Sequence, residues 1–261
     1  MKNIVITLLL IGLISCNKER IGSDPKGPIN EKSYIQGFFE LNDLIASPVS
    51  GFNVDKVTHS IKNNTSFDPE ILYKISDRVG ISAGTGNERL GNGFIVYGSI
   101  LYDTLVARIG DVSYNSKITD GFAYEGIVVA LVDTLQTVTI TCDKIFDEQH
   151  PVGSNLNDLF SVYFEDPYAT IKNGYKSSIG DNYYTIDAFL NPNFPYSLFG
   201  APLTSVDFTK KYHIGTEWYF ILEKAPEKTD EYLFTVSITN TSGKTIEKDA
   251  IFPIKLKGLN D

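Results

Sequence analysis

The sequence is poor in the residues on which several classes of protein depend. Its 261 residues include two cysteines, too few for a disulfide framework or a four-cysteine zinc site. The three histidines, His59, His150 and His213, stand far apart and match no zinc-ligand spacing. Acidic residues outnumber Lys and Arg by 32 to 23, a net charge of −9. Because nucleic-acid affinity comes mainly from cations that neutralise phosphates, we expect no nucleic-acid partner.

Long apolar runs are also missing. No stretch reaches the ~18 residues of a membrane-spanning helix, so we expect none. The longest run, residues 4–14, follows Lys2 and has the length of a secretory signal core. It ends in Leu13-Ile14-Ser15-Cys16, which resembles the lipobox of bacterial lipoproteins. The alternative is an ordinary signal peptide that is cut near an incidental cysteine.

The lipobox resemblance implies that residues 1–15 are removed and that Cys16 is acylated on its sulfur and new amino group. Acyl chains contribute ~0.8 kcal/mol per buried CH₂, so Cys16 would anchor the chain to a membrane. Residues 16–33 are polar and contain two glycines and two prolines, which indicates a flexible tether. Asn17 rather than Asp follows the cysteine, and by lipoprotein sorting rules this implies an outer-membrane lipoprotein, facing the periplasm or the surface.

From Tyr34 onward apolar residues alternate with polar ones, which is typical of half-buried strands. In Val138–Cys142 the apolar side chains share one face, which predicts that Cys142 is a small buried residue. Residues 232–238, the turn at 240–243 and residues 246–256 predict a closing hairpin. Trp218–Leu222 is apolar on both faces and predicts a central strand. Other expected strands are Tyr34–Leu44, Ile71–Ile75, Phe94–Leu101, Leu105–Ile109 and Ile127–Val132.

No long amphipathic helix is expected, and Ser154–Phe160 is the best helical stretch. The pattern predicts an all-β, antiparallel β-sandwich of the immunoglobulin-like kind. One large sandwich and two small ones both fit the length. If there are two sandwiches, residues 34–110 form an N-terminal β region, residues 111–126 a polar seam between them, and residues 127–261 a C-terminal sandwich.

Two short segments, Leu101–Val106 and Leu131–Gln136, resemble each other and share Asp-Thr-Leu. One interpretation is a pair of corners between strands. The other rests on a resemblance of Asp-Thr plus an aliphatic residue to the O-glycosylation motif of Bacteroidetes, which would make Thr104 and Thr134 acceptors.

The segment Lys144–Phe160 contains Phe-Asp, His-Pro, a glycine and Leu-Asn-Asp before a phenylalanine. With Leu222–Pro226 and the closing hairpin, it resembles a family of uncharacterised Bacteroidetes lipoproteins over residues 127–258. The resemblance implies a lipid-anchored β domain of unknown function and transfers no catalytic residues.

Chemical motifs are scarce. Carboxylates around His150 could hold Ca²⁺, but they do not follow a calcium-loop pattern. The preferred interpretation is a turn at the end of a strand, capped by Asp147, with Pro151 fixing the direction in which the chain leaves it. Gly84–Gly93 lacks the features of a phosphate loop, and no Gly-x-Ser-x-Gly is present. We therefore expect no cofactor, no metal site and no catalytic residue.

Eleven aromatic residues lie between Tyr163 and Phe208, among four prolines. Either they pin a long loop to the body by burial, or they offer rings to a ligand. The candidate ligand-binding residues are Tyr183, Tyr184, Phe194, Tyr196 and Phe199. The leading hypothesis is a non-catalytic module that binds a glycan or an envelope protein. The alternatives are an envelope carbohydrate hydrolase and a structural subunit of a surface complex.

Overall fold

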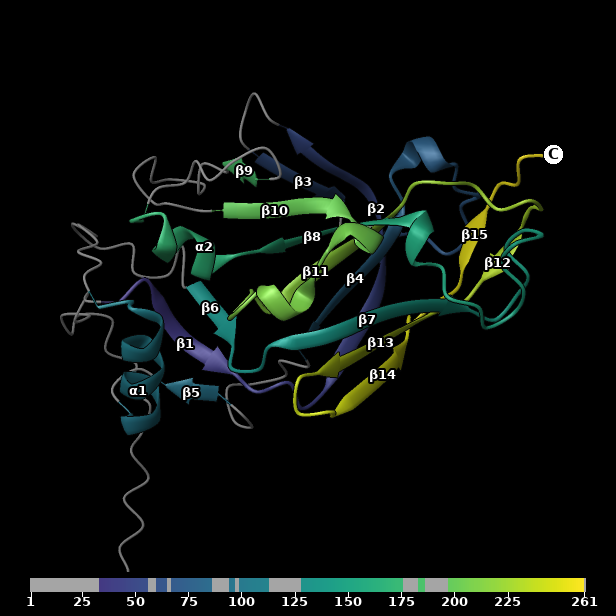
Figure 1. Ribbon diagram of the computed structural model, residues 1–261. Coiled ribbons are helices and arrows are strands. Elements are labelled where there is room, and N and C mark those ends of the chain that lie inside the picture. Colours follow the sequence, from purple (N-terminus) through teal and green to yellow (C-terminus); the bar gives the residue numbers. More distant parts are fainter. Residues whose placement is uncertain are drawn as a thin grey trace, which may run out of the picture.

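The computed structural model describes residues 33–55, 60–64, 67–85, 94–96, 99–112, 128–175, 183–185 and 197–260. Within them the chain is mostly β structure, in sheets that pack face to face (Figure 1). The expected all-β, sandwich-like fold is confirmed. No helix in these ranges is both long and apolar enough to cross a membrane.

The largest sheet has seven strands, and every neighbouring pair in it is antiparallel. Its strands are β2 (Leu44–Asp55), β3 (Ser60–Asn64), β4 (Gly80–Thr85), β8 (Phe160–Glu165), β9 (Tyr183–Thr185), β10 (Ser197–Pro202) and β11 (Glu217–Leu222). Their order across the sheet is β3-β2-β4-β11-β8-β10-β9. The central position of β11, expected from its apolar sequence, is confirmed.

The second layer is a three-stranded sheet of β7 (Leu135–Cys142), β13 (Phe234–Asn240) and β14 (Thr245–Asp249), with β13 in the middle. Phe160 of β8 meets Phe234 of β13 edge-on at 5.7 Å, so the main core lies between the two sheets. Cys142 is buried in this core as expected. The predicted hairpin is confirmed for β13 and β14, whereas β15 (Ile254–Leu256) leaves it and pairs with β12 (Asp230–Tyr232).

A third sheet places β1 (Ile35–Phe39) between β5 (Phe94–Val96), which is antiparallel to it, and β6 (Val128–Leu131), which is parallel. β1 therefore pairs with a strand from beyond residues 111–126, and β4 likewise pairs with β11. Strands of the two predicted β regions are thus interleaved in shared sheets.

Three of the expected strands differ from the structure. Of the strand predicted at Phe94–Leu101, only β5 is confirmed, and the strand predicted at Leu105–Ile109 is wrong because Ile100–Ile109 forms the helix α1. Ser99 caps α1 by accepting the Tyr102 N–H at 3.2 Å, and Gly110 ends it at φ +78°. Ile71–Ile75 makes only an isolated bridge at Tyr73 before the 3₁₀ turn η1 (Ile75–Asp77).

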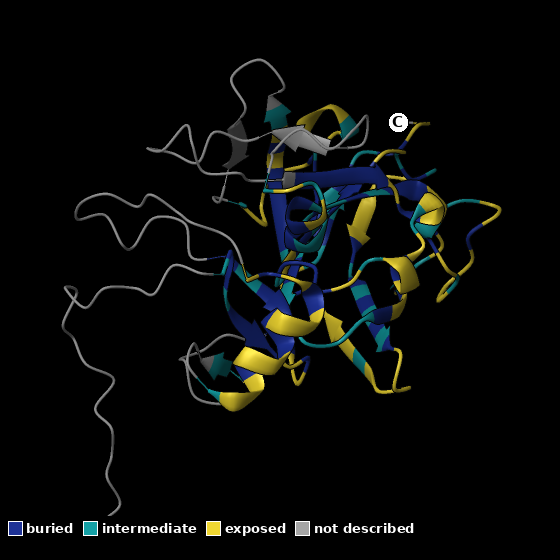
Figure 2. Cartoon of the chain, turned by 60° about the vertical axis from the view of Figure 1, so that its left-hand side comes forward, coloured by how far each residue is buried: buried dark blue, intermediate teal, exposed yellow. Residues whose placement is uncertain are grey.

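α1 covers the third sheet. Its buried side chains pack in one cluster with Ile35, Phe38 and Ile171, the last from α2 (Pro167–Lys172). The outward side of α1 is exposed, while the sheets are largely buried (Figure 2). The remaining 3₁₀ turns are η2 (Asn157–Leu159), within the expected helical stretch, η3 (Leu203–Ser205) and η4 (Phe208–Lys210).

Candidate functional site

His213 occupies a conformation that an L-residue with a bulky side chain seldom adopts. Its φ is +49°, and its side chain is only 4% exposed. The backbone after it is held on both sides, because Ile214 accepts the Leu131 N–H and Gly215 donates to the Glu165 carbonyl, each at 2.8 Å. Strained backbone of this kind costs about 1–3 kcal/mol and is often found at functional sites.

The protonation of His213 follows from its contacts. Nδ1 lies 2.8 Å from the Leu131 carbonyl oxygen, which can only accept, so Nδ1 carries the proton. Burial lowers the pKa of His213 below its ordinary value, the Leu131 bond raises it, and the Arg108 guanidinium lowers it again. The net shift is downward, so at neutral pH the ring is uncharged and Nε2 is a hydrogen-bond acceptor.

His213 lines a cavity of about 300 Å³, at the small end of the volumes of ligand sites. The other described residues that line it are Arg108, Ile109, Thr134, Tyr168 and Tyr212. We call this cavity the His213 pocket. Its walls come from the end of α1, the turn between β6 and β7, α2 and the segment before β11, which lie at one end of the molecule (Figure 1).

Two tyrosine rings form much of the wall. Tyr168 meets Tyr212 edge-on, with 5.5 Å between ring centroids, and lies 6.4 Å from the His213 ring. Phe38 packs edge-on against the His213 ring, with 5.5 Å between the centroids. Tyr212 is 44% exposed, so its ring is accessible at the mouth of the pocket, while Phe38 supports the imidazole from the core.

Several polar groups of the pocket have no hydrogen-bond or ion-pair partner among the described residues. Arg108, the hydroxyls of Thr134, Tyr168 and Tyr212, and Nε2 of His213 make no hydrogen bond or ion pair to a described residue. Two other cations are paired: Arg78 lies 3.2 Å from Glu223 and Lys211 2.9 Å from Asp166. A pocket with aromatic walls and several free donors and acceptors can bind a ligand that has both apolar faces and hydroxyl groups.

The aromatic candidates from the sequence lie elsewhere. Phe199 is buried in the main core, where it packs on Phe164 at 5.0 Å and lies beneath the Lys211 ammonium at 3.8 Å. The burial of Phe199 agrees with the pinning interpretation, and its ring offers little surface to a ligand. Tyr183 and Tyr184 pair with Phe199 and Leu198 through the backbone of β9. Phe194 and Tyr196 lie outside the described residues, as does Cys16.

The two Asp-Thr segments have different surroundings. Thr104 is exposed on α1, and its hydroxyl donates to the Ile100 carbonyl at 2.8 Å, so its segment is helical and not a corner between strands. Thr134 is half-buried in the turn between β6 and β7, where the corner interpretation is confirmed. Thr134 also lines the His213 pocket.

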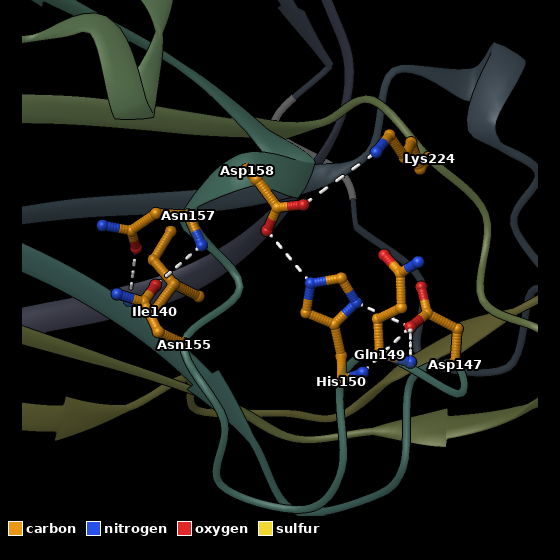
Figure 3. Close-up of polar contacts among 8 residues, drawn as sticks. All are labelled: Ile140, Asp147, Gln149, His150, Asn155, Asn157, Asp158 and Lys224. Atoms are coloured by element: carbon orange, nitrogen blue, oxygen red, sulfur yellow. Dashed lines mark hydrogen bonds and ion pairs between the residues drawn. The ribbon is translucent and has the colours of Figure 1, made fainter.

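The carboxylates near His150 form a structural turn (Figure 3). Asp147 Oδ1 accepts the N–H groups of Gln149 and His150, each at 2.9 Å, which confirms the predicted cap. The His150 ring lies between Asp147, at 2.6 Å from Nδ1, and Asp158, at 3.1 Å from Nε2. Both nitrogens face carboxylate oxygens, so neither is left to activate a nucleophile. No cluster of three or more metal-ligating side chains occurs in the described ranges.

Burial raises the pKa of Asp147, but the hydrogen bonds from the His150 ring and from the Gln149 amide outweigh it. The pKa of Asp147 therefore lies below its ordinary value. This direction indicates that the charged carboxylate is the form that stabilises the turn.

A second hollow, of about 260 Å³, lies on the outer face of the seven-stranded sheet between β2, β4 and β11. Ser47, Ser82 and Glu217 contribute polar groups to it. Its described lining has no aromatic ring, and Glu217 already accepts the Tyr219 hydroxyl at 3.2 Å. The His213 pocket is therefore the better candidate for ligand binding.

The chain matches no family model, no curated protein and no solved structure. The resemblance of residues 127–258 to Bacteroidetes lipoproteins stays a prediction. The fold and the pocket define a β-sandwich-like protein whose described residues form a compact aromatic and polar cavity, and its function has to be argued from that cavity.

Proposed function

We propose that the protein is a lipid-anchored, extracytoplasmic module that binds a carbohydrate in the His213 pocket without cleaving it. The lipobox-like residues 13–16 support the anchor, which would place the protein at the outer membrane. The binding function depends on one observation: four side chains without a described hydrogen-bond partner (Arg108, Thr134, Tyr168 and Tyr212) share one small cavity with His213, whose Nε2 also has none.

A sugar ring fits this combination of groups. Its C–H face packs on an aromatic ring, as those of Tyr168 and Tyr212 allow, while its hydroxyls need donors and acceptors around the rim. His213 Nε2 supplies an acceptor, and the hydroxyl of Thr134 supplies a donor or an acceptor. The β6–β7 turn and the backbone around His213 hold these groups in place before the ligand arrives, which reduces the entropy lost on binding.

The lining also favours binding over hydrolysis. Glycoside hydrolases use two carboxyl groups on opposite sides of the scissile bond. None of the six described residues that line the pocket is acidic. The described lining therefore offers groups that can hold a sugar but supplies neither the acid nor the nucleophile of that reaction.

The test is a glycan array probed with the full chain in mild detergent, followed by calorimetry with the best glycan. Tyr212→Ala should weaken that binding by about tenfold, equivalent to ~1.4 kcal/mol. Phe252→Ala is the matched control, because Phe252 is an exposed ring outside the pocket. The proposal is rejected if no glycan binds, or if Tyr212→Ala binds as tightly as the unmodified chain.

A further inference from the structure

Arg108 is the charged group of the His213 pocket and lacks a counter-ion in the described chain. It lies in the last turn of α1, where a cation complements the helix dipole. No carboxylate pairs with it there, although the whole chain carries nine more negative than positive charges. Arg78, by contrast, is paired with Glu223.

The Arg108 guanidinium, which has no described counter-ion, indicates that the ligand carries a negative charge. Its planar fork binds a carboxylate through two parallel hydrogen bonds, a geometry that a neutral hydroxyl does not match. One unpaired guanidinium balances one negative charge, which suits a carboxylate better than a doubly charged phosphate. Lys172, whose ammonium lies over the Tyr168 ring 5.1 Å from its centroid, is not among the described residues that line the pocket.

The buried imidazole of His213 sets a second requirement for the ligand. Nδ1 of His213 is committed to the Leu131 carbonyl, so Nε2 can only accept a hydrogen bond. A ligand atom at Nε2 must therefore be a donor, such as a sugar hydroxyl, and cannot be the acid group itself. The pocket thus separates an anion position at Arg108 from a hydroxyl position at His213.

We propose that the ligand is an acidic sugar, a pyranose that carries a carboxylate, with the carboxylate on Arg108 and a ring hydroxyl on His213. This inference rests on the carbohydrate-binding function proposed above and specifies the chemical class of its ligand. Arg108 then determines specificity, whereas the tyrosine rings supply affinity for sugars in general.

Calorimetry on the full chain tests this with matched pairs of oligosaccharides. Oligomers of galacturonate and of glucuronate are compared with their methyl esters, which keep the ring and remove the charge, and with the neutral hexose oligomers. The acid of at least one series should bind at least tenfold more tightly than its ester, and the difference should shrink as salt is raised.

Arg108→Gln should abolish the preference for the acid while changing the affinity for the ester less than twofold. Arg108→Lys keeps the charge without the fork and should retain part of the preference. Lys248→Gln removes an exposed charge on β14 and is the control. Thermal melts of Arg108→Gln should fall only slightly below the unmodified chain, because Arg108 makes no hydrogen bond or ion pair with a described residue and only its interaction with the helix dipole is lost.

The outcomes separate the two proposals. Equal affinity for acid and ester, or a preference for the acid that survives Arg108→Gln, overturns the acidic-sugar inference and leaves sugar binding intact. Tighter binding of a sugar phosphate than of the uronate also overturns it. If neither charged nor neutral sugars bind, the proposed function itself fails.

Discussion

Asp111 receives the backbone N–H groups of Tyr34 and Ile35 on its two carboxylate oxygens, at 2.7 and 2.8 Å. The Tyr175 hydroxyl donates to the same carboxylate at 3.2 Å, and the residue is completely buried. Asp111 follows Gly110, which ends α1. The carboxylate therefore joins the first residues of β1 to the end of the helix that covers them.

Replacing Asp111 by Asn tests this connection. Asn has one acceptor oxygen, so one of the two backbone N–H groups would face an amide NH₂ instead. Burial raises the pKa of Asp111 despite its hydrogen bonds, so removing the charge compensates part of the loss. We expect Asp111→Asn to lower the free energy of unfolding by about 1–2 kcal/mol, measured in urea. Asp103→Asn, exposed on α1, should change it by less than about 0.5 kcal/mol. Equal effects of the two substitutions would contradict the role of Asp111.

The turn at Asp147 should depend on pH in the acid range. Because the pKa of Asp147 is lowered in the folded state, its contribution is present above the ordinary pKa of 3.8 and is lost as the pH falls through the folded value. Compared with Asp147→Asn, the unmodified chain should be more stable by about 1 kcal/mol at neutral pH. That difference should shrink below about pH 4 in urea unfolding series. A difference that grows toward acid would show that the charged form is not the stabilising one.

Gly80 lies in β4 where that strand passes close to β11. A methyl group at this position would collide with the main-chain carbonyl of Phe220, which cannot move without breaking the register between the strands. Gly80→Ala should cost about 3 kcal/mol or more of unfolding free energy. Ser82→Ala, on the same strand, should cost much less. Thermal or urea unfolding distinguishes the two, and a mild Gly80→Ala would mean that the strands can separate locally.

The lipid anchor is testable independently of the pocket. Cys16→Ala should abolish incorporation of labelled fatty acid and move the protein from the membrane to the soluble fraction, because acyl chains supply the membrane affinity. Cys142→Ala is the matched control, since that thiol is buried in the core. Mass spectrometry of mature protein that shows an unmodified amino end would rule out acylation at Cys16.

Much of the sheet structure was predictable because period-two patterns were strong in β7, β11 and β13. α1 was missed although its signals were present. Tyr102, Leu105, Val106 and Ile109 recur at helical spacing and are the buried residues of the helix, between the Ser99 cap and Gly110. The apolar stretch around Ile100 was interpreted as strand because it is rich in residues that suit either structure, and short apolar runs leave that choice open.

The candidate site could not be found from local sequence. Arg108, Thr134, Tyr168 and His213 come from four segments, and only the packing of α1 and α2 against the third sheet brings them together. No motif marks His213, whose significance lies in a positive φ and in a hydrogen bond to a residue 82 positions away. The sequence emphasised the density of aromatic residues instead, and Phe199 shows that many rings in one segment can simply be core.

β1 is the first strand of the described chain, so its place in the sheet matters if the chain is anchored at Cys16 as proposed. β1 is bonded to β5 on one side and to β6 on the other. A force along the direction of β1 would load both ladders in shear at once, so the strand could not be peeled away one bond at a time. The proposed lipid anchor would therefore pull on a strand that is held along both of its edges.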